Sequence, residues 1–533
     1  MRKIVTALAF LFLLTGCIGK PSINSSSSSS SSTSASYSGS SSENSSNTTT
    51  LDLIGTDPST RKDETTRKPG GTEKTTKSDK RNSSSSTTKG TQYNVSNLKT
   101  PYYKDGDRVV FIGDSITWTG LYLKDIYAFC VTRYPNERVC FLNRGIAGDT
   151  LTRAFNRFEM DIMSESANKA CLMFGMNDYN QTYYYMQNPD SNTLDLRKRA
   201  IAQFKNNMNT MISKLSNRKI NSLTFLVSSI MDETTVIDSK PVFTFGYNDA
   251  LASSKDQLQT LINGSDRKLV NFNQVMFDAN KELHITDPKS TVVSGDRIHP
   301  GELGSWIMAY CFFKDLGFES DVARVNIDYK NNKITSLKNC ELKNLTKGNK
   351  SINFSYRAYS LPLPATDDYL KADKLVSLTE SFNNEIITVS NLPNGNYTIL
   401  INNKELGTYS SNSLSKGVNI ALSTNNPNQI ISKDIYNYIL AQKNISEIIL
   451  RNIAEIEINL KKSGISLNDQ AGITNKINKW KNGSDNWMKN LAITYETQKP
   501  NQQQIVNSIK NYVDRAYNSS NNTVHHSVVI KAK

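Results

Sequence analysis

The sequence lacks any run of apolar residues long enough to cross a membrane as a mature helix. Its most apolar stretch, Ile4 to Leu14, covers about eleven residues, whereas a membrane-spanning helix needs about twenty. Apolar residues make up only 37% of the 533 residues, which is low for a globular protein. Much of this deficit falls in residues 18–100, so the rest of the chain can still build hydrophobic cores.

Motifs that hold metals or nucleotides are also missing. The sequence has no C-x-x-C spacing, no H-E-x-x-H and no Gly-rich phosphate loop after a strand, so we expect neither a metal nor a cofactor. Six cysteines are present. Without Cys17 the count is odd, which predicts at least one free thiol unless a pair forms between chains.

The first residues have the pattern of an export signal. A short basic start, Met1-Arg2-Lys3, precedes the apolar stretch, whose length is typical of a signal-peptide core. It ends in Leu14-Thr15-Gly16-Cys17, which resembles a bacterial lipobox. We therefore expect a lipoprotein signal peptide at 1–16 and an exported protein that is anchored to a bacterial membrane by lipid on Cys17. The sequence does not determine the membrane leaflet. The alternative is a plain secretory signal.

Residues 17–100 consist mainly of Ser, Thr, Asn, Lys and Gly. Such a composition cannot bury enough apolar surface to offset its ordering entropy, so we expect a disordered tether with a reach of about 50 Å. The chain carries 63 basic and 49 acidic residues, a formal charge of +14. A solvated lysine-rich surface explains this charge, with attraction to anionic surfaces as the alternative. No nucleic-acid motif is present, and we expect no nucleic-acid partner.

Between residues 101 and 320, buried-strand patterns alternate with helical patterns. This order predicts a parallel sheet with helices on both faces, a three-layer α/β domain. The expected strands are 108–112, 139–142, 170–174 and 223–227, and the expected helices are 120–134, 195–216, 248–262, 273–284 and 302–315.

After residue 320 the pattern changes twice. Short β-rich segments separated by turn residues predict a small antiparallel appendage at 321–430. From 431 to 516 the period becomes helical, with an isoleucine stripe at 435–456 that we expect to be core packing rather than a membrane or partner surface. Residues 517–533 are expected to be a frayed tail.

Four polar segments follow predicted strands or precede a predicted helix. They are Gly113–Thr117, Asn143–Thr150, Gly175–Asp178 and Asp296–Pro300. In this order they resemble the four blocks of the SGNH (GDSL) hydrolase superfamily, and the resemblance covers residues 105–316. It implies a flavodoxin-like α/β hydrolase domain that cleaves esters. A G-x-S-x-G elbow is absent, which argues against an α/β-hydrolase.

The resemblance implies a catalytic set. Ser115 would be the nucleophile, His299 the base and Asp296 the residue that orients it. Of the four histidines, only His299 has an aspartate three residues before it, and a carboxylate there can fix the imidazole tautomer. The oxyanion hole would consist of the Ser115 and Gly145 backbone N–H groups and the Asn177 side-chain amide.

Other residues near the blocks favour structural roles. We expect Asp114, Asp149 and Asp178 to organise loops, and Arg157 and Asp161 to form a structural ion pair. Two tryptophans, Trp118 and Trp306, could stack on a sugar, although packing is favoured.

The sequence therefore predicts a serine ester hydrolase that works through an acyl-enzyme. An O-acetylesterase acting on a carbohydrate or cell-wall polymer is favoured, because a tethered surface enzyme with a β-rich appendage suits a polymeric ester. One alternative is a lysophospholipase or short-chain lipase. The other is a surface-binding lipoprotein with an inert or secondary hydrolase domain.

Overall fold

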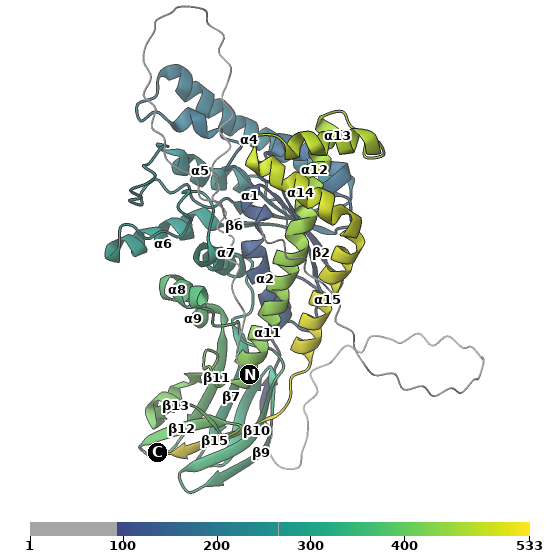
Figure 1. The fold of residues 1–533 in the computed structure, drawn as a ribbon. Helices are drawn as coiled ribbons and strands as arrows, with labels where there is room; N and C mark the ends of the chain where they lie inside the picture. Colours follow the sequence, from purple (N-terminus) through teal and green to yellow (C-terminus); the bar gives the residue numbers. More distant parts are fainter. Residues whose placement is uncertain (1–92, 265) are drawn as a thin grey trace, which may run out of the picture. The chain divides into compact units, whose positions relative to one another are not determined.

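The computed structural model describes residues 93–264 and 266–533, all within the compact unit Ser85–Lys533 (Figure 1). The signal peptide expected at 1–16, Cys17 and most of the expected tether lie outside the described residues. The end of the tether does not, because Asn94–Ser96 form strand β1. Secondary structure therefore begins before residue 101, where the hydrolase domain was expected to start.

A parallel sheet of five strands forms the first large layer, in the order β3-β2-β4-β5-β6. Four of its strands are the predicted apolar runs, buried on both faces as parallel strands are. The fifth, β6, was not predicted, because Arg267 and Lys268 interrupt its apolar pattern and an edge position tolerates them. The strands are β2 (Arg108–Gly113), β3 (Cys140–Gly145), β4 (Lys169–Phe174), β5 (Ser222–Val227) and β6 (Arg267–Asn271).

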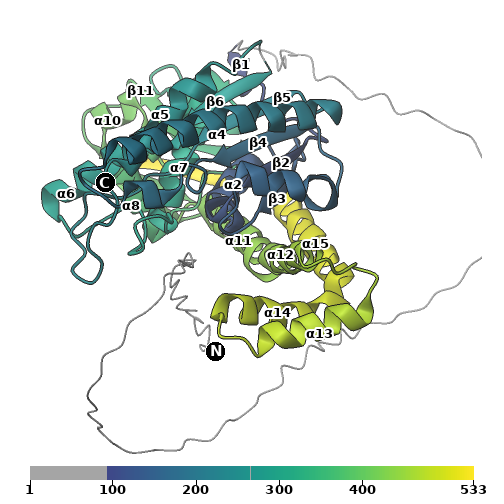
Figure 2. The same cartoon turned by 90° about the horizontal axis from the view of Figure 1, so that it is seen from above.

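Helices cover both faces of this sheet, so the fold is the expected three-layer α/β hydrolase domain. On one face α4 and α5 are in contact, and on the other α2 contacts α7 (Figure 2). The long helices are α2 (Leu121–Arg133), α4 (Ser191–Asn217), α5 (Tyr247–Gln259), α6 (Phe272–Thr286) and α7 (Glu302–Asp315). Shorter ones follow β2, β3 and β4: α1 (Ser115–Trp118), α3 (Leu151–Asn156), η1 (Phe158–Ile162) and η2 (Gln181–Tyr184).

The β-rich region is larger than the small antiparallel unit that we expected. It contains two five-stranded sheets, β1-β8-β7-β11-β14 and β13-β12-β15-β10-β9, whose inward side chains share one hydrophobic core. The first sheet is mixed, because β1 pairs with β8 and β7 with β11 in parallel. Its strands are β7 (Asp321–Asp328), β8 (Lys333–Lys338), β11 (Asn384–Ser390) and β14 (Val418–Asn419), and those of the second are β9 (Cys340–Gly348), β10 (Ser351–Ala358), β12 (Asn396–Ile401), β13 (Lys404–Ser410) and β15 (His526–Ala532). Helices α8 (Asp367–Val376), α9 (Leu378–Phe382) and α10 (Ser411–Lys416) lie between strands in the chain.

The end of the chain is the clearest difference from the expectation. Residues 517–533 are not a frayed tail, because β15 lies between β12 and β10 in the middle of the second sheet. Val528 and Ile530 point into the core and are fully buried. The strand has polar residues at both ends, so only a few of its residues show the period-two alternation. For this reason the sequence pattern did not predict a strand here.

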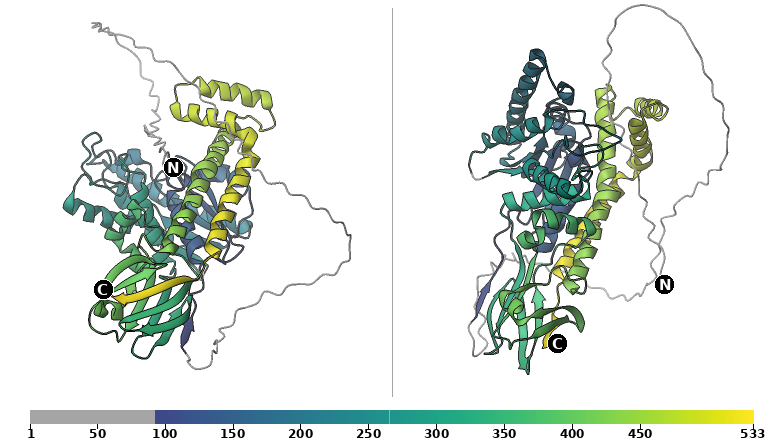
Figure 3. Two further views of the ribbon diagram at one scale, coloured as in Figure 1. Left: turned by 60° about the horizontal axis from the view of Figure 1, so that its bottom comes forward. Right: turned by 90° about the vertical axis from the view of Figure 1, so that its left-hand side faces the viewer.

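The helical region packs along the hydrolase domain. Helix α11 contacts both α2 and α15, and α15 also contacts α2, so the long helices run side by side (Figure 3). The isoleucine stripe is mostly core, as expected, although Ile445 is exposed. The elements are α11 (Pro427–Ala441), η3 (Gln442–Glu447), α12 (Ile448–Lys462), α13 (Gln470–Lys481), α14 (Asn486–Gln498), η4 (Lys499–Asn501) and α15 (Gln502–Asn521).

The stripe divides between two cores. Ile435 and Ile439 join the core of the hydrolase domain, whereas Ile453 and Ile456 pack with α13 and α14 in a separate cluster. All five described cysteines are free thiols: Cys130, Cys140, Cys171, Cys311 and Cys340.

Candidate active site

Ser115 lies at the turn from β2 into α1. Asp114 caps this helix, since its Oδ1 accepts a hydrogen bond from the Ile116 N–H at 3.0 Å. A Cβ on Gly113 would approach Thr117 Oγ1 to 2.3 Å and a backbone oxygen of β4 to 2.8 Å, so only glycine fits before this turn. Ser115 itself is partly exposed, and its N–H is one of the free donors at the start of a helix.

His299 connects Ser115 to Asp296. The distance from His299 Nε2 to Ser115 Oγ is 2.8 Å, and that from His299 Nδ1 to Asp296 Oδ2 is 2.6 Å. With the Nδ1 proton donated to the carboxylate, Nε2 is the basic nitrogen that faces the serine hydroxyl. The structure thus brings together the three residues that the sequence predicted as nucleophile, base and orienting acid.

The Asp296 carboxylate is held by its own loop. Its Oδ1 accepts hydrogen bonds from the backbone N–H groups of Ile298 and His299, at 3.0 Å each. Burial would raise the pKa of Asp296, but these bonds and the His299 ring outweigh it and hold the pKa well below its usual range. Asp296 is therefore ionised at neutral pH and can stabilise an imidazolium.

Arg297 anchors this loop, a role that we did not predict. It has a φ of 72°, and its side chain is almost fully buried. The guanidinium donates hydrogen bonds to the backbone oxygens of Asp232, Thr235 and Lys240. A buried arginine with several carbonyl acceptors fixes the backbone between Asp296 and His299.

The other histidines lie elsewhere. His284 Nε2 is 2.9 Å from Thr235 Oγ1. His525 and His526 belong to the β-rich region, where they contact Glu341 and Asn402. Among the described residues, His299 is the histidine whose ring is hydrogen-bonded to Ser115, so it is the one that can serve as base.

The expected oxyanion donors differ in whether their N–H groups are free. The Gly145 N–H donates to Asn143 Oδ1 at 2.9 Å, so it is not free to meet an oxyanion and the expectation for this residue is wrong. Glycine is needed there for packing, because a Cβ would approach Trp118 N to 2.2 Å. The Asn177 amide donates one hydrogen to Asp149 O at 3.0 Å, which leaves its second hydrogen available.

Gly148 is the better backbone candidate in the same block. It is exposed and has a φ of 65°, and within the described residues no hydrogen bond of its N–H is found. It immediately precedes Asp149, whose carbonyl oxygen holds the Asn177 amide. The sequence signal was present, since Gly148 is the second glycine of the block, but only the path of the loop distinguishes it from Gly145.

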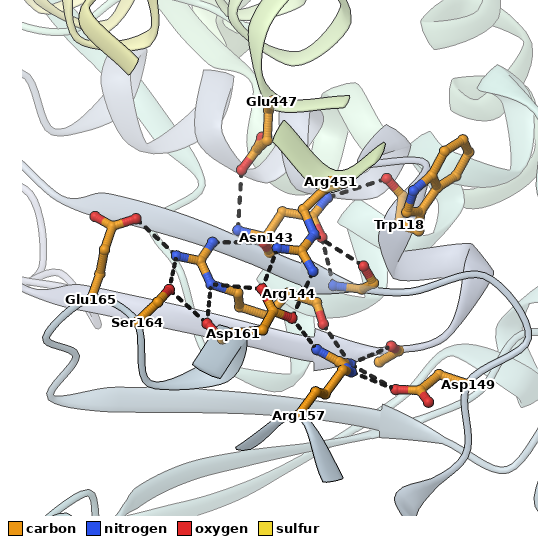
Figure 4. A network of polar contacts seen from close by, with 12 residues as sticks. Trp118, Asn143, Arg144, Asp149, Arg157, Asp161, Ser164, Glu165, Glu447 and Arg451 are labelled. Atoms are coloured by element: carbon orange, nitrogen blue, oxygen red, sulfur yellow. Dashed lines mark hydrogen bonds and ion pairs between the residues drawn. The ribbon is translucent and has the colours of Figure 1, made fainter. Parts of the chain in front are cut away.

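The aspartates near the site organise loops, as expected. Asp178 accepts hydrogen bonds from the N–H groups of Leu151 and Gly175, and thereby ties the loop after β3 to the loop after β4. Burial raises the pKa of Asp114 and of Asp178 to about 7. Asp149 bonds Arg157, which in turn pairs with Asp161 at 2.6 Å (Figure 4).

The two tryptophans are packing residues. Trp306 is fully buried and lies against Tyr369 and Tyr436. Trp118 is partly buried and contacts Trp487 edge-on, with 5.4 Å between ring centroids.

Two features are absent from residues 93–264 and 266–533. No group of three His, Cys, Asp or Glu side chains there could hold a metal ion. No helix in the same ranges combines the length and apolar character needed to span a bilayer.

The segment that carries this site is similar to known hydrolases. Residues 109–312 match the family described as GDSL-like Lipase/Acylhydrolase. An acetylxylan esterase from Geobacillus stearothermophilus is 21% identical over 229 residues, which are 40% of this chain and 95% of the relative. The solved structure of a gut microbial diltiazem-metabolizing enzyme is 26% identical with a TM-score of 0.73, and the match covers 82% of this chain and 100% of that one.

The structural match extends beyond the family segment, so the β-rich and helical regions are shared with that enzyme at least in part. The segment that holds Ser115, Asn177 and His299 matches the GDSL-like lipase/acylhydrolase family, and the chain is an ester hydrolase.

Proposed function

We propose that the protein is a serine O-acetylesterase that acts on a carbohydrate or cell-wall polymer through an acyl-enzyme. The observation that carries the serine mechanism is the continuous chain from Ser115 Oγ through His299 to Asp296, with distances of 2.8 and 2.6 Å. An unaided serine hydroxyl is a poor nucleophile, and a hydrogen-bonded imidazole activates it.

The first half of the reaction forms the acyl-enzyme. Ser115 Oγ attacks the ester carbonyl carbon while its proton moves to His299 Nε2. The carbonyl oxygen becomes an oxyanion that accepts hydrogen bonds from Ser115 N–H, Gly148 N–H and the Asn177 amide. Each such donor is worth about 2.7–4 kcal/mol in other serine hydrolases. His299 then gives its proton to the leaving alkoxide, and the alcohol departs.

The second half releases the acid. A water molecule loses a proton to His299 Nε2 and attacks the acyl carbon through the same oxyanion site. His299 returns the proton to Ser115 Oγ as the carboxylic acid leaves. Asp296 stays ionised throughout and stabilises the imidazolium at both stages.

Similarity to known proteins guides the choice of substrates. The curated relative is an acetylxylan esterase that the chain matches over nearly its full length, which favours an acetyl group on a sugar. The solved enzyme that covers most of the chain is described as diltiazem-metabolizing, so this drug belongs among the test substrates.

The chain-length preference for the acyl group tests the proposal. Residues 85–533 and the matched variant Ser115→Ala should be assayed on p-nitrophenyl esters from acetate to laurate, on acetylated xylan and on diltiazem. We expect the highest kcat/KM on acetate, acetate release from the polymer, and no turnover by the variant. An optimum at long acyl chains would instead support the lysophospholipase or lipase alternative. Equal turnover by both proteins would exclude Ser115 as the nucleophile.

We also propose that the protein is exported and anchored by lipid on Cys17. The support is the basic start, the apolar stretch and the lipobox-like Leu14–Cys17. In a bacterial host, the full chain should incorporate labelled palmitate and sediment with membranes. Cys17→Ser should do neither, and label in that variant would contradict the assignment.

A further inference from the structure

Arg451 reaches from helix α12 into the hydrolase domain. Its two terminal nitrogens donate to the two oxygens of Asp161, each at 2.7 Å, and its Nε donates to the Gly145 carbonyl oxygen at 3.1 Å (Figure 4). Both partners are buried: Arg451 is 3% and Asp161 5% exposed. A bidentate guanidinium–carboxylate pair with a third hydrogen bond fixes geometry in a way that a single charge does not.

Asp161 also connects Arg451 to the oxyanion loop, residues 145–149, through a chain of hydrogen bonds. Its Oδ2 also accepts from Arg157 Nη1 at 2.6 Å. Arg157 Nε in turn donates to Asp149 Oδ2 at 2.8 Å, and Asp149 O holds the Asn177 amide. Burial would raise the pKa of Asp161, but Arg451 first and then Arg157 hold it well below its usual range.

A second contact from the same helical region supports the start of the loop. Glu447 Oε1 accepts the Asn143 N–H at 3.1 Å. The Asn143 side chain holds the Gly145 N–H and donates to Thr117 O at 2.9 Å, so it joins the loop to the helix that begins at Ser115. Trp487 adds a contact with Trp118.

We propose that Arg451 is a positioning residue for ester hydrolysis: it holds the oxyanion loop in register with Ser115. The proposal rests on the proposed serine mechanism. It makes the C-terminal helical region, which lies outside the matched family segment 109–312, part of the working enzyme. Misplacement of an oxyanion donor by about 1 Å costs on the order of 100-fold in rate. Loss of the Arg451 contacts should therefore lower kcat and leave KM nearly unchanged.

The test uses the full chain and two variants at this position. Arg451→Met keeps much of the side-chain length but removes all three hydrogen bonds. Arg451→Lys keeps the charge but cannot make the bidentate pair with Asp161. Tyr517→Phe is the matched control. The Tyr517 hydroxyl joins α15 to Val139 and Glu137, just before the first residue of β3, whereas Arg451 contacts Gly145 at the last residue of β3. Ser115→Ala is assayed beside them.

Endpoint labelling with a fluorophosphonate probe counts the molecules that have an activated serine, and kcat is expressed per labelled serine. For Arg451→Met we expect full endpoint labelling, slower labelling, a kcat about 10- to 100-fold lower and a KM within about threefold of the parent. Arg451→Lys should fall in between, and Tyr517→Phe should match the parent.

A kcat per labelled serine within about twofold of the parent for Arg451→Met would overturn the proposal, as would an equal loss in Tyr517→Phe. If Arg451→Met fails to fold and labels poorly, Arg451→Lys decides in the same way, and parent-like kcat in that variant overturns the proposal. Turnover that survives in Ser115→Ala would sink the serine mechanism itself, a result that is distinct from any outcome at Arg451.

Discussion

At the scale of single residues, the Asp296–His299 hydrogen bond carries the most weight for function. Replacement by Asn keeps the shape of the side chain but lets its amide donate to Nδ1, which favours the wrong imidazole tautomer. By analogy with other serine triads, Asp296→Asn should lower kcat about 10⁴-fold while the midpoint of thermal unfolding stays nearly unchanged. Initial rates on p-nitrophenyl acetate measure this, and a loss smaller than about tenfold would show that Asp296 does not orient the base.

Glu455 gives a prediction about stability and pH. It is 5% exposed, and burial raises its pKa to about 7 against a usual 4.5, although Trp487 donates a hydrogen bond to it. Between these pH values the folded state keeps a proton that the unfolded chain has lost, so the free energy of unfolding falls as pH rises. Asp114 and Asp178 add to the same trend.

Glu455→Gln removes one titrating group and keeps an acceptor for the indole. Its free energy of unfolding should therefore fall less than that of the parent between about pH 5 and pH 7.5, as urea denaturation at several pH values would measure. The exposed Glu496→Gln is the control. Parallel curves for parent and Glu455→Gln would mean that Glu455 is ionised across this range.

At the scale of elements, burial decided what the sequence could predict. The strands β2, β3, β4 and β5 are apolar runs buried on both faces, and the sequence located all four. Strand β6 begins with two basic residues, and β15 is short and polar at both ends, so neither gave a clear period. Strand β1 pairs in parallel with β8, and β7 pairs in parallel with β11. These partners are distant in the chain, so local sequence patterns do not encode the pairing.

Strand β15 offers a test of this account. Ile530 is fully buried in the core shared by the two sheets. Ile530→Ala should lower the free energy of unfolding by about 2–5 kcal/mol, whereas Ser527→Ala, on the exposed side of the same strand, should change it little. Equal, small effects in urea titrations would show that the last residues do not fill the core.

At the scale of the whole molecule, the site combines residues that the sequence could and could not connect. Ser115, Asp296 and His299 were recognisable because their blocks stand at strand ends in a known order. Gly148 was missed in favour of Gly145, because only the loop's path shows which N–H is free. Arg451 had no signal: its partner Asp161 lies 290 residues earlier in the chain, and nothing in the helical pattern marks one arginine as buried.

The most direct test of the central claim is the identity of the acylated residue. The full chain is mixed with p-nitrophenyl acetate, quenched in acid during turnover and digested, and the peptides are sequenced by mass spectrometry. The account predicts one acetyl group on Ser115, present in the parent and in Asp296→Asn and absent from Ser115→Ala. Acetyl on another residue, or turnover in the parent without an acetylated serine, would contradict it.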